Sequence, residues 1–219
     1  VARIQYQGGN YEQAIAAYER ILASNPEDPQ RHSARFELAL CYRDLGERDQ
    51  AVAAFHQVDV VSGLLPRAML ESSQLLAESR EYDRALEALE RGLEVSEDAV
   101  ERARLYYTQG RTLMEMEEYA RAVPVLERTG QVSSEGGVVE GAAYGRGVSL
   151  FKLERYSEAV AQLEQLLASD NAELAAAAQR MVGLAHLELG REQEAVAPYT
   201  ALLETAQDEE EQAAHLLVL

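Results

Sequence analysis

The stretch of sequence that decides the fold spans residues 36–55 and reads FELALCYRDLGERDQAVAAF. Its first half places Ala39 and Tyr42 on one helical face, because side chains three or four positions apart lie together on a helix. Gly46 follows, and glycine is the usual residue just past the C-terminus of a helix. A second run with helical spacing then starts around Ala51. The stretch therefore predicts two amphipathic helices joined by a tight turn.

The second half of this hairpin recurs along the whole chain. Each copy has two residues, most often polar, before an alanine, and an aromatic residue or leucine four positions after it. The pairs are Ala14 with Tyr18, Ala51 with Phe55, Ala85 with Leu89, Ala122 with Leu126, Ala159 with Leu163 and Ala195 with Tyr199. Successive alanines are 37, 34, 37, 37 and 36 residues apart. Six copies in register predict an array of repeated helix pairs.

A second pattern precedes five of these copies by about twelve residues. It is a small residue three positions before a large one. The pairs are Ala39 with Tyr42, Ser73 with Leu76, Gly110 with Leu113, Gly147 with Leu150 and Gly183 with His186. We expect the small residues to let the two helices of a pair approach closely, and the large ones to fill the groove between neighbouring pairs.

These motifs resemble the tetratricopeptide repeat family, whose signature is Trp-x2-Leu-Gly-x2-Tyr in a first helix and Ala-x3-Phe in a second. The chain departs from the signature because it has no Trp and because most of its units are longer than 34 residues. The resemblance implies an all-α fold, a right-handed α-solenoid of about six stacked helix-turn-helix repeats that forms one domain over residues 1–219. Units of 36–37 residues are similar to the bacterial cell-envelope branch of the family, which favours the periplasm over the cytoplasm as the compartment.

The periodicity predicts where the helices lie. We expect helices at residues 1–7, 10–24, 30–45, 48–61, 66–79, 82–95, 98–116, 118–130, 137–153, 156–169, 171–189, 192–206 and 208–219. Pro124 and Pro198 fall inside two of them, where each removes a backbone hydrogen bond; we expect local bends there and not breaks.

The resemblance implies a ligand groove lined by one face of each first helix. On this face we place residues with i, i+4 and i+7 spacing, whereas the small residues Ala39, Gly147 and Gly183 belong to the opposite, packing face. The groove residues are Phe36, Leu40, Arg43, Leu70, Gln74, Tyr107, Arg111, Met114, Tyr144, Val148, Phe151, Lys152, Arg180, Leu184 and Leu187. Aromatic residues and arginine are enriched at protein interfaces, which favours a protein or peptide partner. The alternative for each residue taken singly is that it packs against the next repeat.

Charge narrows the classes of partner. The formal net charge is −18, from 20 Lys and Arg against 38 Asp and Glu. Nucleic acid is disfavoured, because its binding requires basic side chains that neutralise phosphates. No apolar run is long enough for insertion into a membrane. The groove arginines would select an acidic or carboxylate-bearing partner. Family members that hold a C-terminal carboxylate use Asn and Lys, and no Asn occurs at the matching positions, Leu40, Gln74, Arg111, Val148 and Leu184.

No pattern in the sequence predicts catalysis, a cofactor or a metal. His32, His56, His186 and His215 lie in different repeats, without the spacing of metal ligands. Cys41 lies in an apolar helical run, where a small buried side chain is the expected role.

The sequence therefore predicts an interaction scaffold and not an enzyme. Two alternatives stay open: a structural element that self-associates through its repeat ends, and the targeting arm of a larger enzyme.

Overall fold

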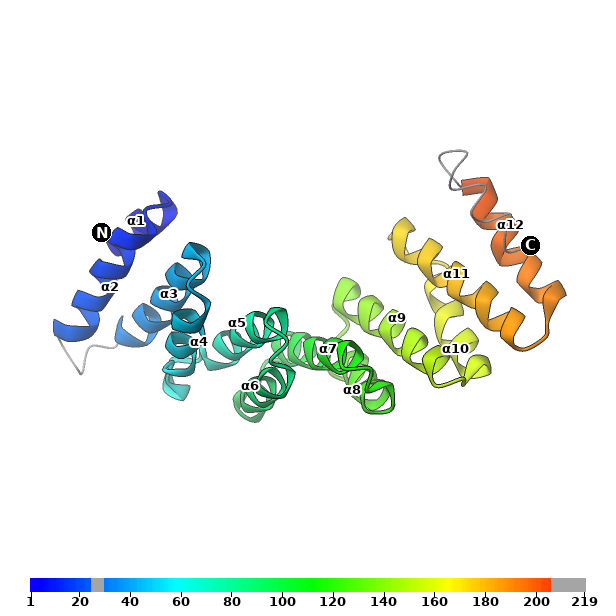
Figure 1. Ribbon diagram of the computed structural model, residues 1–219, viewed down its shortest axis with the longest axis horizontal. Coiled ribbons are helices and arrows are strands. Elements are labelled where there is room, and N and C mark those ends of the chain that lie inside the picture. Colours follow the sequence, from blue (N-terminus) through cyan, green and yellow to red (C-terminus); the bar gives the residue numbers. More distant parts are fainter. Residues whose placement is uncertain (25–29, 206–219) are drawn as a thin grey trace. The chain divides into compact units, whose positions relative to one another are not determined.

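The computed structural model describes residues 1–24 and 30–205, and it is helical throughout this part of the chain (Figure 1). The α-helices are α1 (Ala2–Gln7), α2 (Tyr11–Ser24), α3 (Gln30–Leu45), α4 (Arg48–His56), α5 (Leu65–Glu78), α6 (Tyr82–Val95), α7 (Ala99–Glu115), α8 (Tyr119–Val132), α9 (Gly136–Lys152), α10 (Tyr156–Leu163), α11 (Ala172–Glu188) and α12 (Glu192–Thr205). Two short 3-10 helices, η1 (Val60–Ser62) and η2 (Glu164–Leu166), interrupt the series. The predicted fold class, an all-α solenoid of helix pairs, is confirmed.

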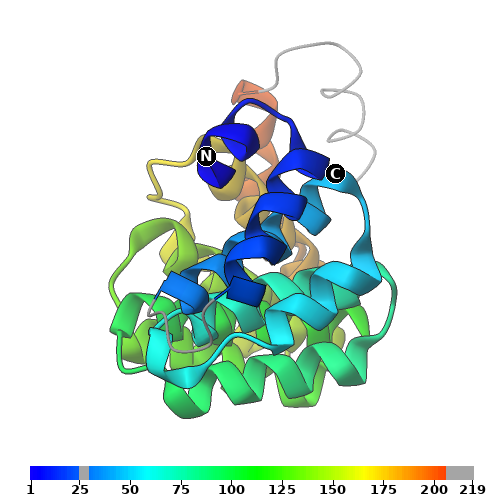
Figure 2. The same ribbon diagram turned by 90° about the vertical axis from the view of Figure 1, so that its left-hand side faces the viewer.

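Consecutive helices pack against each other from α1 to α6 and from α8 to α12, and Gly110 of α7 lies against Leu126 of α8, so the pairs form hairpins. Figure 2 shows the first of these hairpins, α1 and α2, in dark blue. The chain divides into two compact units, Val1–Thr108 and Gln109–Leu219, with the boundary inside α7. They are called unit 1 and unit 2 below. That residues 1–219 form one continuous solenoid stays a prediction.

Two of the predicted helices end earlier than expected. The helix predicted at 48–61 ends at His56, because the chain turns there to bury Val58 in the core. Asp59 then accepts a hydrogen bond from Arg35 at 2.6 Å, and its carbonyl accepts one from the Ser62 hydroxyl, also at 2.6 Å. Such side-chain bonds compete with helix formation.

The helix predicted at 156–169 is α-helical only to Leu163 and continues as the tighter η2. Pro124 and Pro198 lie inside α8 and α12, and both helices continue through them, as expected. The helix predicted at 208–219 lies outside the described residues.

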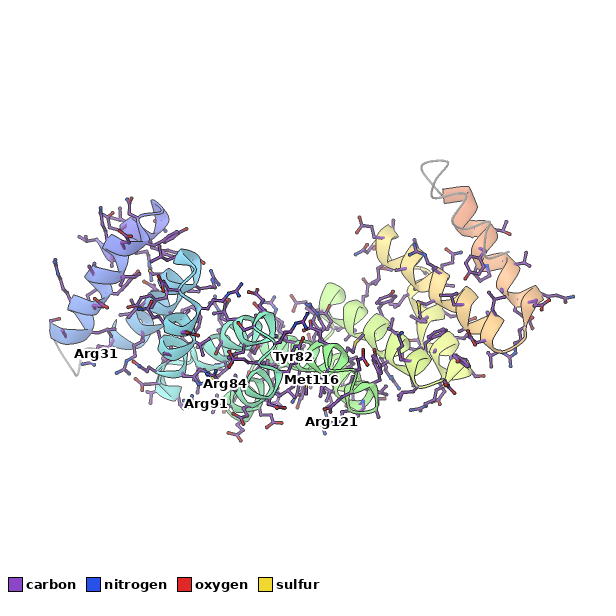
Figure 3. All side chains as sticks on the ribbon, in the orientation of Figure 1. Arg31, Tyr82, Arg84, Arg91, Met116 and Arg121 are labelled. Carbon is purple, nitrogen blue, oxygen red and sulfur yellow. The ribbon has the colours of Figure 1, made fainter. Side chains whose placement is uncertain are left out.

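The turn inside each hairpin has the same backbone geometry in all six repeats. One residue has a positive φ, and it always lies five positions before the repeat alanine. These residues are Gly9, Gly46, Arg80, Glu117, Glu154 and Gly190, with φ between 59° and 87°. Tyr82, the first residue of α6, and Met116, just after α7, mark two of these turns in Figure 3. Only glycine adopts this conformation without steric cost, so three repeats hold an unfavourable residue there.

The small residue of the first helix lies against the second helix of its own pair in unit 2. A Cβ atom added to Gly147 would lie 2.5 Å from Cγ of Leu163, and one added to Gly183 would lie 2.7 Å from the ring of Tyr199. A Cβ on Gly110 would collide with Leu126 in the same way. The close approach predicted for these hairpins is therefore confirmed.

Candidate functional site

A hollow of about 380 Å³ opens in unit 1 between α1, α3 and α5. These are alternate helices of the series. The second helices of the pairs, α2 and α4, do not contribute to the lining. The lining residues are Arg3, Tyr6, Gln7, Ser33, Phe36, Glu37, Leu40, Leu64 and Arg67. The first helices of unit 1 therefore share one hollowed face.

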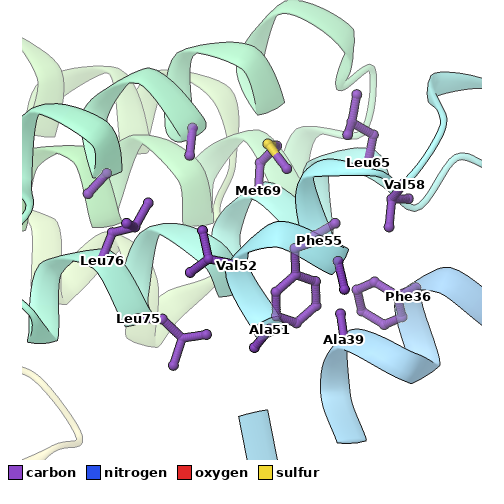
Figure 4. Close-up of a cluster of buried hydrophobic side chains, with 14 residues drawn as sticks. Phe36, Ala39, Ala51, Val52, Phe55, Val58, Leu65, Met69, Leu75 and Leu76 are labelled. Carbon is purple, nitrogen blue, oxygen red and sulfur yellow. The ribbon is translucent and has the colours of Figure 1, made fainter. Parts of the chain in front are cut away.

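The floor of the hollow is apolar. Phe36, Leu40 and Leu64 form it, and Phe36 also belongs to the hydrophobic core shown in Figure 4. The ring of Phe36 lies 5.7 Å from the ring of Phe55, and only 5% of the residue is exposed. For Phe36 the packing alternative therefore applies: its ring supports the floor and offers little surface to a partner.

Two hydrogen-bonded groups of charged side chains surround this floor. In the first, Glu37 accepts hydrogen bonds from Arg3 and from the hydroxyl of Tyr18. In the second, Asp44 accepts a hydrogen bond from Tyr6 at 2.6 Å and one from Arg43 at 2.7 Å.

The second group extends to α5 and shifts two pKa values. Arg43 also donates to Glu71 at 2.5 Å. Burial and the hydrogen bond to Asp44 raise the pKa of Tyr6 to about 12. Burial alone would raise the pKa of Asp44, but the hydrogen bonds from Arg43 and Tyr6 outweigh it and lower this pKa. The predicted groove residue Arg43 therefore binds two carboxylates of its own chain.

Arg67 differs from the other arginine that lines the hollow. Its guanidinium carbon lies 5.2 Å from the centre of the Phe36 ring, in a cation–π contact. Arg67 is exposed and has no carboxylate partner within the described residues of the chain. Stacking occupies the face of a guanidinium group and leaves the N–H donors at its edge available.

The remaining predicted residues of unit 1 extend the same face. Leu70 and Gln74 follow Arg67 on α5 at i+3 and i+7; Leu70 is half-buried and Gln74 is exposed. Tyr107 on α7 is half-buried.

In unit 2, the predicted residues divide into packed and exposed side chains. Tyr144 and Phe151 pack against the core of α9, α10 and α11, where the Phe151 ring lies 5.2 Å from Tyr156. Met114 packs against Gly145, and Leu187 packs against the cluster around Tyr199. Val148 and Leu184 are half-buried, whereas Arg111, Lys152 and Arg180 are exposed. Arg111 lies 3.9 Å from Glu115.

A second hollow of about 380 Å³ lies between α4, α5 and α6 and is lined in part by His56, which forms a pair with Ser72 of α5. Nε2 of His56 lies 3.0 Å from Oγ of Ser72. Burial, followed by the charges of Arg91 and Arg84, lowers the pKa of His56. Ser72 is fully buried, so its hydroxyl cannot reach a substrate and the pair has a structural role.

The family model of the tetratricopeptide repeat matches this chain over residues 2–59, 70–128 and 144–210. The chain belongs to the tetratricopeptide repeat family. The predicted resemblance is thereby confirmed over most of the sequence.

Solved structures of other tetratricopeptide repeat proteins have the same fold. YrrB, described as a TPR protein with an unusual peptide-binding site, is 19% identical, with 93% of this chain and 98% of that chain covered and a TM-score of 0.71. MamA is 20% identical, with 84% and 95% covered and a TM-score of 0.69. The pilF protein of Pseudomonas aeruginosa is 18% identical, with 99% and 93% covered and a TM-score of 0.66. The comparison with curated proteins gave no match.

Of the residues that line this tetratricopeptide hollow, the predicted groove contained only Phe36 and Leu40. It missed the other seven, which are Arg3, Tyr6, Gln7, Ser33, Glu37, Leu64 and Arg67. Arg67 could have been found, because it lies six positions before Ser73, one turn ahead of the predicted Leu70. Leu64 could not, because it comes from the link between α4 and α5.

Within residues 1–24 and 30–205, no group of three His, Cys, Asp or Glu side chains could hold a metal ion. Among the helices of this part of the chain, none has the length and apolar character needed to cross a bilayer. Cys41 is fully buried, as predicted.

Proposed function

We propose that this tetratricopeptide repeat protein is an interaction scaffold that binds a protein or peptide on the face formed by its first helices. The observation that carries the proposal is the hollow between α1, α3 and α5, with its apolar floor and its rim of arginine and tyrosine. Apolar pockets with a few polar groups at the edge are typical of sites that bind ligands and side chains. The peptide-binding site of YrrB, a protein of the same fold, supports this direction.

In unit 2, the exposed cations Lys152 and Arg180 lie on the corresponding first helices, α9 and α11. Val148 and Leu184 supply half-buried apolar surface on these helices. Interfaces combine an apolar centre with a polar rim, and this composition fits that pattern.

Site-specific photocrosslinking tests the proposal. A photoreactive benzoylphenylalanine replaces Gln74 on α5, and in a matched variant it replaces Glu87 on α6. Both positions are exposed, but only Gln74 lies on the first-helix face. The corresponding pair in unit 2 is Lys152 on α9 and Arg121 on α8; Arg121 is labelled in Figure 3.

After illumination in an extract of the source cells, we expect protein adducts from the Gln74 and Lys152 variants and none from the Glu87 and Arg121 variants. Mass spectrometry then identifies the partner. Adducts that form equally well on both members of each pair contradict the proposal. Adducts with a second copy of the chain support self-association instead.

A further inference from the structure

The hollow in unit 1 combines an apolar floor with one cation that has no carboxylate partner. From this geometry we infer that it binds an acidic peptide segment: an apolar side chain enters the hollow, and the carboxylate of a neighbouring Asp or Glu binds Arg67. The inference rests on the proposed function, because it names the partner chemistry of that same face.

The floor selects the apolar side chain. Leu40 and Leu64 are half-buried and line the hollow together with Phe36, so the hollow presents carbon surface to solvent. Its volume of about 380 Å³ is at the small end of the range for ligand pockets, about 300 to 1,000 Å³. One or two side chains of a peptide fill a space of this size, and removing this surface from water favours binding.

Arg67 selects the carboxylate. Guanidinium groups stay charged at all physiological pH values and bind carboxylates through two parallel N–H donors. The contact with the Phe36 ring, at 5.2 Å, holds the guanidinium beside the floor without using these donors. An apolar residue in the hollow therefore brings the next side chain of the same peptide to Arg67.

The carboxylates around the hollow are already bound to cations of the chain. Glu37 is paired with Arg3, while Asp44 and Glu71 are both paired with Arg43. These pairs reduce the repulsion that a chain with a formal net charge of −18 would exert on an acidic peptide. The charge left without a partner on the lining of the hollow is that of Arg67.

The surface beside the hollow indicates a side-chain carboxylate and not a terminal one. Gln7 of α1 lies on the lining, and Leu70 and Gln74 of α5 continue the face beyond Arg67. A peptide therefore has surface to contact before and after the hollow. This arrangement fits a segment that passes through, which is why we assign the carboxylate to Asp or Glu.

A pair of capped synthetic peptides tests the inference on the full chain. Both carry a leucine in a glycine–serine context, followed by glutamate in one peptide and by glutamine in the other. Fluorescence anisotropy gives the Kd of each. We expect the glutamate peptide to bind at least about tenfold more tightly, and to lose this advantage as salt is raised.

Two arginine variants then test whether Arg67 is the cation that binds the glutamate carboxylate. Arg67→Gln should raise the Kd of the glutamate peptide about tenfold and leave the glutamine peptide unchanged. Arg20→Gln is the matched control, since Arg20 is exposed on α2, lies outside the hollow and has no ion pair within residues 1–24 and 30–205. Circular dichroism and the melting temperature confirm that both variants fold.

Each other outcome overturns the inference in a distinguishable way. If both peptides bind equally and Leu40→Ala weakens both, the hollow binds peptides but Arg67 selects no carboxylate. If a glutamine peptide with a free C-terminus binds as tightly as the capped glutamate peptide, the carboxylate is a terminal one. If neither peptide saturates the protein at millimolar concentration, the hollow is not the site, while crosslinks from Lys152 decide the proposed function separately.

Discussion

The two units build the same hairpin but differ in the small residue at the contact between its two helices. In unit 2 the small residue of the first helix is always glycine, at positions 110, 147 and 183. In unit 1 it is Ala39 or Ser73, and both are fully buried. Ala39 belongs to the core around Phe55, so its methyl group is part of the packing. How closely the two helices approach therefore depends on the small residue of each hairpin and is not the same in every repeat.

The largest expected change in the free energy of unfolding comes from replacing the glycine of one unit by alanine and the alanine of the other by glycine. Gly147→Ala should lower the free energy of unfolding by about 2 kcal/mol, because the new Cβ would lie 2.5 Å from Leu163, which is itself fully buried. Ala39→Gly should also lower it, by about 2 kcal/mol, through the lost methyl group and the lower helix propensity of glycine. Chemical denaturation measures both.

Gly137→Ala is the control for this pair. Gly137 lies at the start of α9, its φ is not positive, and an added Cβ would meet nothing within 4 Å. The free energy of unfolding of the Gly137→Ala variant should stay the same or rise by up to about 1 kcal/mol. If Gly147→Ala lowers the free energy of unfolding no more than Gly137→Ala does, the two units do not differ at this contact.

A smaller effect is expected at the turns, where the comparison is between repeats. Glu117→Gly and Glu154→Gly should each raise the free energy of unfolding by about 0.5 to 1 kcal/mol, because glycine relieves the positive φ. Gly46→Ala, at the same position of unit 1, should lower it by about 1 kcal/mol. Thermal and chemical melts of the three variants test this. A loss of stability on Glu154→Gly would mean that its side chain contributes more than the backbone conformation costs.

A pH-dependent effect, which is small near neutral pH, isolates unit 1. Burial, with the nearby charges of Asp44 and Glu37, raises the pKa of the Cys41 thiol from 9.0 to about 11. The folded state therefore holds this proton more tightly than the unfolded state. The resulting stability is fully present below about pH 9 and is lost as the pH rises from 9 to 11.

At pH 8 the thiolate fraction of the folded chain should be about a hundredfold lower than that of the unfolded chain, so reaction with a disulfide reagent should be slow. Because Cys41 is the single cysteine, its reactivity reports on unit 1 alone. Gly147→Ala should leave that reactivity unchanged. Faster labelling in this variant would show that the units unfold together.

Most of the fold could be predicted because each repeat encodes its hairpin locally. Helical periodicity alone is enough to interpret the spacing of the alanines and of the small residues as pairs of helices. The early end of α4 could not be predicted, because it depends on the bond between Arg35 and Asp59, residues on different elements. The turns at Arg80, Glu117 and Glu154 lie between the predicted helices, as expected, but their positive φ could not be predicted, because glycine was the only signal for that conformation in the sequence.

The candidate site could be predicted only in part. Helical spacing found the face of Phe36 and Leu40 but could not distinguish a packed ring from an exposed one. That distinction depends on Phe55, which comes from the next helix. Arg67 has the same helical spacing and lies one turn before the predicted Leu70.

The early end of α4 has a consequence for how this protein could acquire new partners. Leu64 reaches the floor of the hollow from the link that replaces the end of α4, and this link is anchored by Asp59 and Ser62. The residues that shape the hollow are thus partly separate from those that hold the repeat together. Changes at Leu64 can therefore reshape the proposed binding site of unit 1, provided that Val58 of the same link, which is buried in the core, is kept.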